Sequence, residues 1–312
     1  MNNTILEKKP LVSVYTCVYN GEKTLHRVFN SVKNLNYPNI EHVIINDGST
    51  DKTDSLITEY ISQVSYPVKY HKKSNGGKHT ALNIAWDIAE GEFAIQLDAD
   101  DELLPDCINM LVSEYYQIPE ETRDQYFCVN GRCRTQHGDF VGLPYPDGIN
   151  ELSWEDAKKA SAKCRGDKIS LYVLKLLRPY KLPEVPCVKF LPEAIIWKQM
   201  NLKYRTRYTN EVGLIYYVNE GGSLTSKSKS RRHYNAFTYN YKWKIIHPEL
   251  YKKSFKLLFR YSVGFFISDK EYQTKNKYFD EITNTKDKLI LSVLCPFTMP
   301  AAFFYRLIKG IK

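Results

Sequence analysis

The chain has 312 residues, of which 43% are hydrophobic and 25% charged, a composition typical of a soluble globular protein with one large domain or one domain and an appendage. Its net charge of +9 indicates anionic partners such as nucleotide phosphates, nucleic acid or acidic lipid. Seven scattered cysteines favour a reducing compartment, and the polar residues 1–10 lack the apolar core of a signal peptide, which argues against secretion.

The first hundred residues alternate strands with helices. Apolar, β-branched runs predict strands at 11–18, 40–45, 68–71 and 93–97. Helical spacing predicts helices at 22–35, from Thr50 or Asp51 to about 61, and over 81–88. Strands that alternate with helices form a parallel sheet with right-handed crossovers, so the sequence predicts a nucleotide-binding layout.

Beyond residue 105 the pattern is looser. It predicts a helix at 106–116, a strand at 126–135, helices or extended flaps at 154–163 and 169–177, a helix at 192–200 and a late strand at 212–218. A polar, basic run over 223–233 marks the expected boundary between a catalytic domain, residues 1–222, and a C-terminal segment, residues 223–312.

The most informative motif follows the strand at 93–97, where the apolar run ends in Asp98, Asp100 and Asp101. Ligands of open α/β sheets bind beyond the carboxyl ends of such strands, and crowded carboxylates are costly unless a cation shares their charge. Aspartate oxygens suit Mg²⁺ or Mn²⁺, ions that also bind phosphates. The triplet therefore predicts a metal site that holds a diphosphate, and a solvated acidic loop is the alternative. Asp47, which ends the strand at 40–45, is expected at the same sheet edge.

Four motifs in this order and spacing resemble the inverting glycosyltransferases of family 2, which have the GT-A fold. The motifs are VSV with YNGE at 12–14 and 19–22, NDGSTD at 46–51, GK with ALN at 77–78 and 81–83, and LDADD at 97–101. The resemblance implies a Rossmann-like, mixed, mainly parallel sheet flanked by helices. We expect a mostly helical C-terminal extension. Cys17 stands where many relatives have proline.

The resemblance also assigns a nucleotide pocket. It implies that Asp47 accepts the imide proton of uracil or a comparable base, and that Tyr19, Asn20 and Glu22 line the pocket. Asp98 is expected near the ribose. A turn-forming aspartate before glycine is the alternative role for Asp47.

The resemblance also assigns two residues to the diphosphate of the donor, a metal ligand and a lysine. The resemblance implies that Asp100 binds Mn²⁺ or Mg²⁺ and that Lys78 faces the diphosphate from the first turn of a helix, where backbone N–H groups also favour anions. A solvated lysine after a loop is the alternative for Lys78.

Inversion requires a base that deprotonates the acceptor hydroxyl, and the candidate is Glu193 at the start of an apolar helix. Its alternative role is to complement the helix dipole. Relatives often have Glu-Asp here, whereas this chain has Glu193-Ala194; Asp156 and Glu184 are the fallback acids. No Gln-x-x-Arg-Trp motif of processive synthases follows, so we expect one sugar to be transferred per encounter.

The C-terminal segment is basic and aromatic. Arg231, with its neighbours Arg232 and His233, could close over the diphosphate, contact lipid headgroups or form a solvated linker. Residues 252–266 have an apolar helical face flanked by lysines, and 289–308 are apolar but interrupted by prolines. These patterns fit either an interfacial membrane surface or packing on the catalytic domain.

The sequence therefore predicts a metal-dependent, inverting, non-processive glycosyltransferase that moves a sugar, from UDP in our interpretation, to a lipid-linked glycan acceptor in cell-envelope polysaccharide assembly. We expect it in the cytoplasm, peripheral on the inner face of the cell membrane. A catalytically silent nucleotide-sugar-binding module is the alternative. Nucleic-acid binding is disfavoured because the basic residues are dispersed.

Overall fold

The computed structural model describes residues 9–184, 189, 191–218, 296, 297 and 300. By its contacts the chain divides into two units, Met1–Leu182 with Lys203–Gly221, and Pro183–Leu202 with Gly222–Lys312. The predicted boundary between residues 222 and 223 lies outside the described residues, as does the expected helical C-terminal extension.

The first unit is built on a mixed sheet of eight strands in the order β3-β2-β1-β4-β7-β6-β8-β5. Its strands are β1 (Val12–Val18), β2 (Ile40–Asn46), β3 (Val68–Lys72), β4 (Phe93–Gln96), β5 (Glu102–Leu103), β6 (Tyr126–Thr135), β7 (Lys168–Val173) and β8 (Arg205–Tyr216). The strands β3, β2, β1 and β4 are mutually parallel, whereas β7 runs antiparallel to β4 and β6. The predicted mixed, mainly parallel sheet is confirmed.

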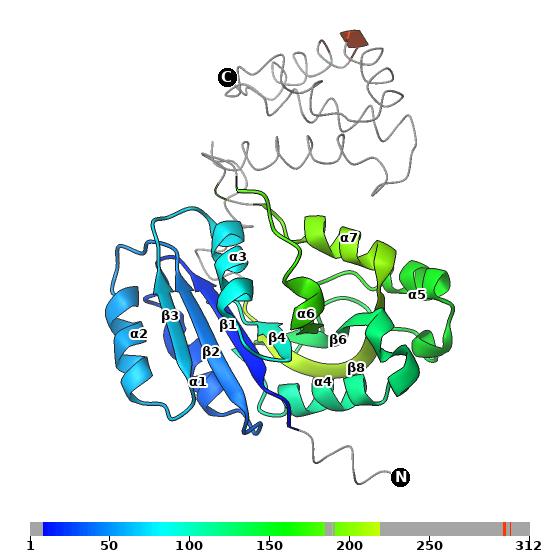
Figure 1. Ribbon diagram of the computed structural model, residues 1–312, viewed down its shortest axis with the longest axis horizontal. Coiled ribbons are helices and arrows are strands. Elements are labelled where there is room, and N and C mark those ends of the chain that lie inside the picture. Colours follow the sequence, from blue (N-terminus) through cyan, green and yellow to red (C-terminus); the bar gives the residue numbers. More distant parts are fainter. Residues whose placement is uncertain (1–8, 185–188, 190, 219–295, 298–299, 301–312) are drawn as a thin grey trace. The chain divides into compact units, whose positions relative to one another are not determined.

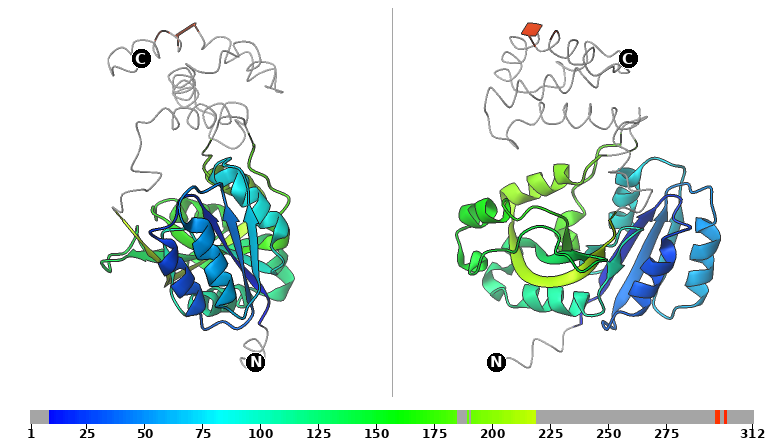
Figure 2. Two further views of the ribbon diagram at one scale, coloured as in Figure 1. Left: turned by 90° about the vertical axis from the view of Figure 1, so that its left-hand side faces the viewer. Right: turned by 180° about the vertical axis from the view of Figure 1, so that it is seen from behind.

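Helices connect and cover these strands (Figure 1). They are α1 (Leu25–Lys33), α2 (Thr53–Ser62), α3 (Lys78–Ile88), α4 (Cys107–Tyr116), α5 (Trp154–Ser161) and α6 (Leu174–Leu177), with short 3₁₀ turns at Glu120–Gln125 and Ile149–Glu151. A further helix, α7 (Ala194–Lys203), belongs to the second unit except for its last residue. Figures 1 and 2 show α1 and α2 on one side of the β3–β2–β1 part of the sheet and α3 on the other. This is the doubly wound arrangement that the alternating pattern predicts.

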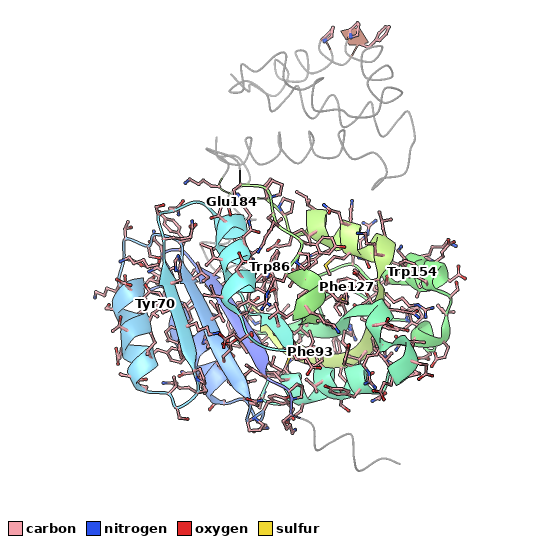
Figure 3. The ribbon with its side chains drawn as sticks, in the orientation of Figure 1. Tyr70, Trp86, Phe93, Phe127, Trp154 and Glu184 are labelled. Carbon is pink, nitrogen blue, oxygen red and sulfur yellow. The ribbon has the colours of Figure 1, made fainter. Side chains whose placement is uncertain are left out.

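The core explains why these segments are strands. All seven residues of β2 are buried, as expected for a parallel strand covered on both faces. Figure 3 shows the side chains, including the fully buried Trp86 of α3 and Phe93 of β4. Burying a large apolar side chain contributes about 1.5–3 kcal/mol, so this layer sets the positions of the strand ends.

Three local predictions need correction. The residue before α2 is Lys52, although the Asp51 carboxylate does accept the Thr53 N–H at 3.1 Å. The stretch predicted as a helix or flap over 169–177 is strand β7 followed by the short α6. The last strand begins at Arg205 rather than at residue 212, because β8 pairs in parallel with β6 from Tyr126 onward.

Candidate active site

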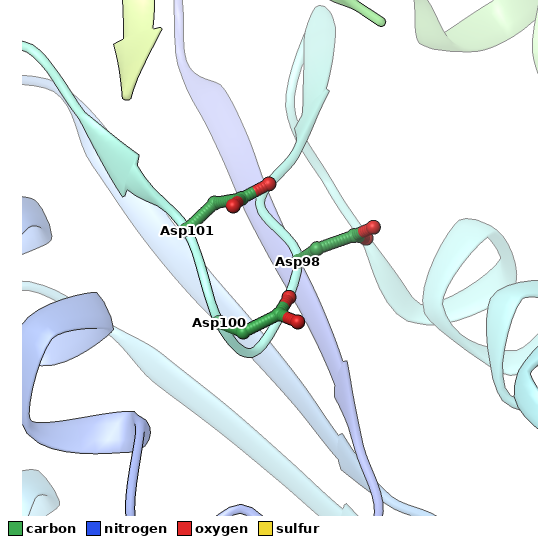
Figure 4. A group of neighbouring side chains, drawn as sticks. All are labelled: Asp98, Asp100 and Asp101. Carbon is green, nitrogen blue, oxygen red and sulfur yellow. The ribbon is translucent and has the colours of Figure 1, made fainter. Parts of the chain in front are cut away.

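Three carboxylates converge on the loop that follows β4 (Figure 4). The Leu97 N–H still bonds to the Tyr15 carbonyl of β1 at 3.0 Å, and the Asp101 N–H closes a turn on the Asp98 carbonyl at 3.2 Å. One carboxylate oxygen from each of Asp98, Asp100 and Asp101 lies within 4.8 Å of the others. The sequence-predicted acidic cluster therefore forms at the carboxyl end of β4.

The three acids have different electrostatic states. Burial opposes ionisation of Asp98, but the charge and hydrogen bonds of Lys78 outweigh it and lower the Asp98 pKa. Burial and the neighbouring Asp98 charge raise the pKa of Asp100. Burial raises the pKa of Asp101 to about 8, against a hydrogen bond from the Tyr217 N–H at 3.1 Å. Such crowding of carboxylates is favourable only when positive charge is supplied.

Lys78 is part of this cluster. It is the first residue of α3, preceded by Gly77 at a φ of +98°, a conformation that favours glycine. Its ammonium lies 2.8 and 2.9 Å from the two carboxylate oxygens of Asp98, and the Gln96 amide donates to the same carboxylate at 2.9 Å. The residue is thus engaged at the acidic site and is not a solvated lysine.

Asp47 lies at the same edge of the sheet, directly after β2, and is 3% exposed. Its carboxylate accepts hydrogen bonds from the Gly76 and Gly77 N–H groups at 2.8 and 2.7 Å and from the Lys73 ammonium at 2.8 Å. Gly48 follows at a φ of +73°, and a Cβ there would lie 2.6 Å from the Asn75 nitrogen. Asp47 therefore organises the loop before α3, which is more than a turn residue requires.

The segment 19–22 ends β1 and packs along the loop after β2. Asn20 has a φ of +53°, and its side-chain oxygen accepts the Thr50 N–H at 2.8 Å. The Glu22 N–H donates to the Asp51 carboxylate at 3.0 Å. Tyr19 is 48% exposed, so its ring is open to a ligand. The sheet order places these residues on the Asp47 side of the acidic cluster.

The candidate base lies in the second unit. The carbonyl of Glu193 accepts the N–H groups of Ile196 and Trp197 in the first turn of α7, and its side chain is half-buried. Its role as base stays a prediction. Of the fallback acids, Asp156 bonds to the N-cap Ser153 and to Lys159, and Glu184 is exposed. Arg231 lies outside the described residues.

Sequence reasoning missed two contacts of the site. Lys73, which bonds to Asp47, follows β3 at the same sheet edge, and that position was a usable signal. Tyr217 reaches Asp101 from the end of β8, and its ring lies 3.9 Å from the Arg27 guanidinium. No local pattern could have revealed this contact, because it joins residues far apart in the sequence.

Comparison with known proteins identifies the family. Residues 13–157, which hold the acidic cluster, Asp47 and Lys78, match the family model Glycosyl transferase family 2. These residues form a glycosyltransferase family 2 domain. The domain has the GT-A fold, as its structural neighbours show. The predicted family and fold are therefore confirmed.

Relatives of this glycosyltransferase domain match it over part of their length. An uncharacterized glycosyltransferase of Haemophilus influenzae is 38% identical over 109 residues, 35% of this chain and 33% of that protein. The hyaluronan synthase of Pasteurella multocida is 36% identical over 110 residues, again 35% of this chain but 11% of the synthase. The chain thus spans a third or less of these two relatives.

Solved structures share the glycosyltransferase fold over more of the chain. The 1–349 fragment of S. aureus TarS in complex with UDP-GlcNAc has a TM-score of 0.54 at 17% identity, covering 89% of this chain and 78% of the fragment. A mannosyltransferase of Pyrobaculum calidifontis in complex with GDP-Man and Mn²⁺ has a TM-score of 0.51 at 16% identity. The match covers 98% of this chain and 76% of the mannosyltransferase chain.

Proposed function

We propose that this protein is a metal-dependent, inverting, non-processive glycosyltransferase. It moves a sugar from UDP to a hydroxyl of a lipid-linked glycan acceptor in cell-envelope polysaccharide assembly. The convergence of Asp98, Asp100 and Asp101 within 4.8 Å, beside Lys78 and at the sheet edge of Asp47, carries the proposal. The UDP-GlcNAc and GDP-Man complexes among the fold neighbours support a nucleotide-sugar donor.

The donor set of the acidic cluster fits a hard divalent cation. Carboxylate oxygens are the preferred ligands of Mg²⁺ and Mn²⁺. Burial and the neighbouring carboxylates raise the pKa values of Asp100 and Asp101, an effect that a bound cation would oppose. Asp100 would hold the ion. When bound, it would supply charge that stabilises the departing diphosphate.

The chain's own residues would position the donor around this point. Lys78, at the N-terminus of α3, would contact the diphosphate together with backbone N–H groups of the first turn. Asp98 would face the ribose, and Asp47 would accept the base imide proton while it holds the loop before α3. The remaining pocket residues would be Tyr19, Asn20 and Glu22.

Glu193 would take the proton of the acceptor hydroxyl on the face opposite the diphosphate, which inverts the anomeric centre. A positioned general base contributes about 10²- to 10⁴-fold in rate. Arg231 would donate to the phosphate oxygens from the C-terminal segment.

Turnover distinguishes the enzyme from a silent nucleotide-sugar-binding module. We expect divalent-dependent hydrolysis or transfer from one member of a nucleotide-sugar panel, and Glu193→Gln should abolish it while the UDP affinity in calorimetry is retained. Glu184→Gln is the matched control, since Glu184 is an exposed acid of the same stretch. If turnover is lost only in Glu184→Gln, the general base is Glu184 and not Glu193. A wild type without turnover would favour the silent nucleotide-sugar-binding module.

Membrane association belongs to the same proposal. Within the described residues, no helix combines the length and apolar character that a membrane crossing requires. The amphipathic pattern at 252–266 supports peripheral binding to an anionic surface on the cytoplasmic side. Flotation with anionic liposomes tests this, and a wild type that stays at the bottom of the gradient would contradict it.

A further inference from the structure

Two cations face each other across β6 and β7, the strands that follow β4 in the order of the sheet. Arg132 of β6 and Lys168 of β7 are register partners in an antiparallel pair, which places their Cβ atoms about 5 Å apart on one face. Arg132 is 6% exposed and Lys168 is half-buried. Like charges directly opposite one another in a sheet are destabilising. The presence of both cations therefore indicates an interaction that offsets their repulsion.

The polar atoms of this pair are poorly satisfied within the protein. Arg132 Nε and Lys168 Nζ are buried and have no hydrogen-bond partner within the described part of the chain. Among the described residues, the one hydrogen bond of the Arg132 guanidinium is donated from Nη2 to the Gly142 carbonyl at 3.3 Å. No ion pair joins either cation to a carboxylate in the part of the chain that the structure describes. Burial is the largest cause of the lowered Lys168 pKa and the Arg132 charge adds to it, whereas Cys133, Cys164 and Asp167 act in the opposite direction.

Aromatic rings line the pair. The Phe140 ring lies 4.1 Å from the Arg132 guanidinium, and the Tyr145 ring lies 5.2 Å from the Lys168 ammonium. Phe140 is itself 59% exposed, so the guanidinium lies about one side chain below the surface. A ring face attracts a cation but does not replace a hydrogen-bond acceptor.

The position of the pair relates it to the active site. Strands β4 and β7 pair up to Ile95 and Leu171; Asp98 and Lys168 each lie three residues beyond, at the same end of the pair. Ile169 and Leu171 point into the main core, so Lys168 lies on the opposite face, as does Ser170, which donates to Asn130 of β6 at 2.7 Å. The register therefore places Lys168 at the end of the β4–β7 pair that leads into the acidic loop.

The sheet order decides which part of a substrate would reach this pair. Strand β4 lies between β1 and β7, so the pair is on the side of the acidic cluster away from Tyr19 and Asp47. If the nucleotide occupies the β1–β2 side, as the proposed function requires, then the β7–β6 side receives the transferred sugar or the acceptor.

We propose that Arg132 and Lys168 form a binding site for an oxyanion, a carboxylate or phosphate group, carried by the transferred sugar or by the acceptor next to it. An oxyanion accepts from both Nε and Nζ and compensates both charges. This ligand class would distinguish an acidic sugar from a neutral one.

The donor arm of the test compares UDP-glucuronate with UDP-glucose by calorimetry in the presence of Mn²⁺. If the anion is on the donor, the wild type binds UDP-glucuronate about tenfold more tightly, since one charge-assisted hydrogen bond has that effect. Lys168→Met should abolish the preference and leave the affinity for UDP unchanged within about twofold. Arg132→Met is the second variant.

The acceptor arm measures free glucuronate against free glucose on the UDP-loaded protein. If the anion is on the acceptor, the donors show no preference, but glucuronate binds more tightly than glucose, and Lys168→Met abolishes the difference. The matched control is Lys158→Met, which removes a lysine 4.6 Å from the Trp154 ring in α5. This control should retain the wild-type preference.

Three results would overturn the site: no preference for an anion in either arm, a preference that survives in Lys168→Met, or an equal loss in Lys158→Met. A protein that fails to bind UDP contradicts the proposed function instead. Free glucuronate binding that depends on Lys168 would still support the oxyanion site in that case. Without ligand, Lys168→Met should unfold at a higher temperature than the wild type, because an uncompensated buried charge is removed.

Discussion

Adjacent carboxylates of the loop after β4 are bonded to different groups. Both carboxylate oxygens of Asp98 accept hydrogen bonds from the Lys78 ammonium, and the Asp101 carboxylate accepts one from the Tyr217 N–H. Asp98 and Asp101 are therefore each held by a hydrogen bond from another part of the protein, whereas burial and the Asp98 charge raise the pKa of Asp100. This division of roles is the physical basis for assigning the metal to Asp100.

Asp100→Asn should weaken Mn²⁺-dependent UDP binding by about 10- to 100-fold, the cost of losing a metal-site group. The fold should be as stable as the wild type or more so, because one repelling charge is removed. Calorimetry with and without Mn²⁺ measures the effect. Asp106→Asn, an acid that bonds to Asn36 in the turn before α4, is the control and should bind as the wild type does. Retained metal dependence in Asp100→Asn would rule out this ligand.

The buried His42 is expected to make the stability of the fold sensitive to acid. Its buried ring lies within hydrogen-bond distance of the Thr16 hydroxyl at 3.1 Å and of the Tyr60 hydroxyl at 2.8 Å, and burial lowers its pKa to about 3. Between the unfolded value of about 6.5 and this folded value, only the unfolded state binds the proton. Stability is therefore lost as pH falls through this window, by at most about 1.4 kcal/mol per pH unit.

His42→Gln should flatten the stability-against-pH curve between about pH 6.5 and 4 relative to the wild type, once its lower stability at neutral pH is subtracted. Urea unfolding at a series of pH values measures this. His26→Gln, at an exposed position on α1, is the control. An unchanged slope in His42→Gln would show that another group titrates there.

At the scale of elements, α3 connects two parts of the chain. Its first residue, Lys78, bonds to Asp98, and in its middle the Asn83 amide pairs with the backbone of Leu182, donating to the carbonyl at 2.8 Å and accepting the N–H at 2.9 Å. Arg178 donates to carbonyls of the last turn, Trp86 and Ala89. The helix therefore fixes Lys78 and Leu182, the last residue of the first unit before Pro183.

Asn83→Ala should destabilise the protein by about 1–3 kcal/mol, because the buried backbone groups of Leu182 lose both partners. Urea unfolding measures the change. Asn30→Ala, at an exposed position on α1, should change stability by less than about 0.5 kcal/mol. Equal effects in the two variants would show that the amide pairing contributes nothing.

The elements that sequence could predict are those with a clear period. Apolar runs of β1, β2 and β4 are buried on both faces, and their alternation with helices specifies a parallel sheet without further information. Strand β7 is ambiguous in the sequence because its apolar residues continue without a break into the short α6. The first half of β8 was missed because Arg205 and Arg207 are charged and only partly buried there.

At the scale of the whole molecule, the site includes a contact from the end of β8, a strand far along the sequence from the acidic loop. No local sequence pattern encodes this contact. Strand β8 pairs with β6 and with β5, the strand that follows the acidic loop, and its next residue, Tyr217, bonds to Asp101. Motifs could predict Asp47 and the acids because they follow the ends of β2 and β4, and Lys78 because it begins α3 after a glycine pair. The Arg132–Lys168 pair and Tyr217 required the register between distant strands.

The proposed site residues fall into the first unit except for Glu193 and Arg231. Ligands that bind only the native state stabilise it by mass action, so UDP with Mn²⁺ at about 100 times the dissociation constant should add about 2.7 kcal/mol. Lys78→Met should abolish most of this increment, whereas Glu193→Ala should keep it, since the base acts on the acceptor. Thermal unfolding with and without UDP and Mn²⁺ measures both. A Glu193→Ala variant that loses the increment would place that residue in the donor pocket, and a wild type without any increment would contradict the nucleotide site itself.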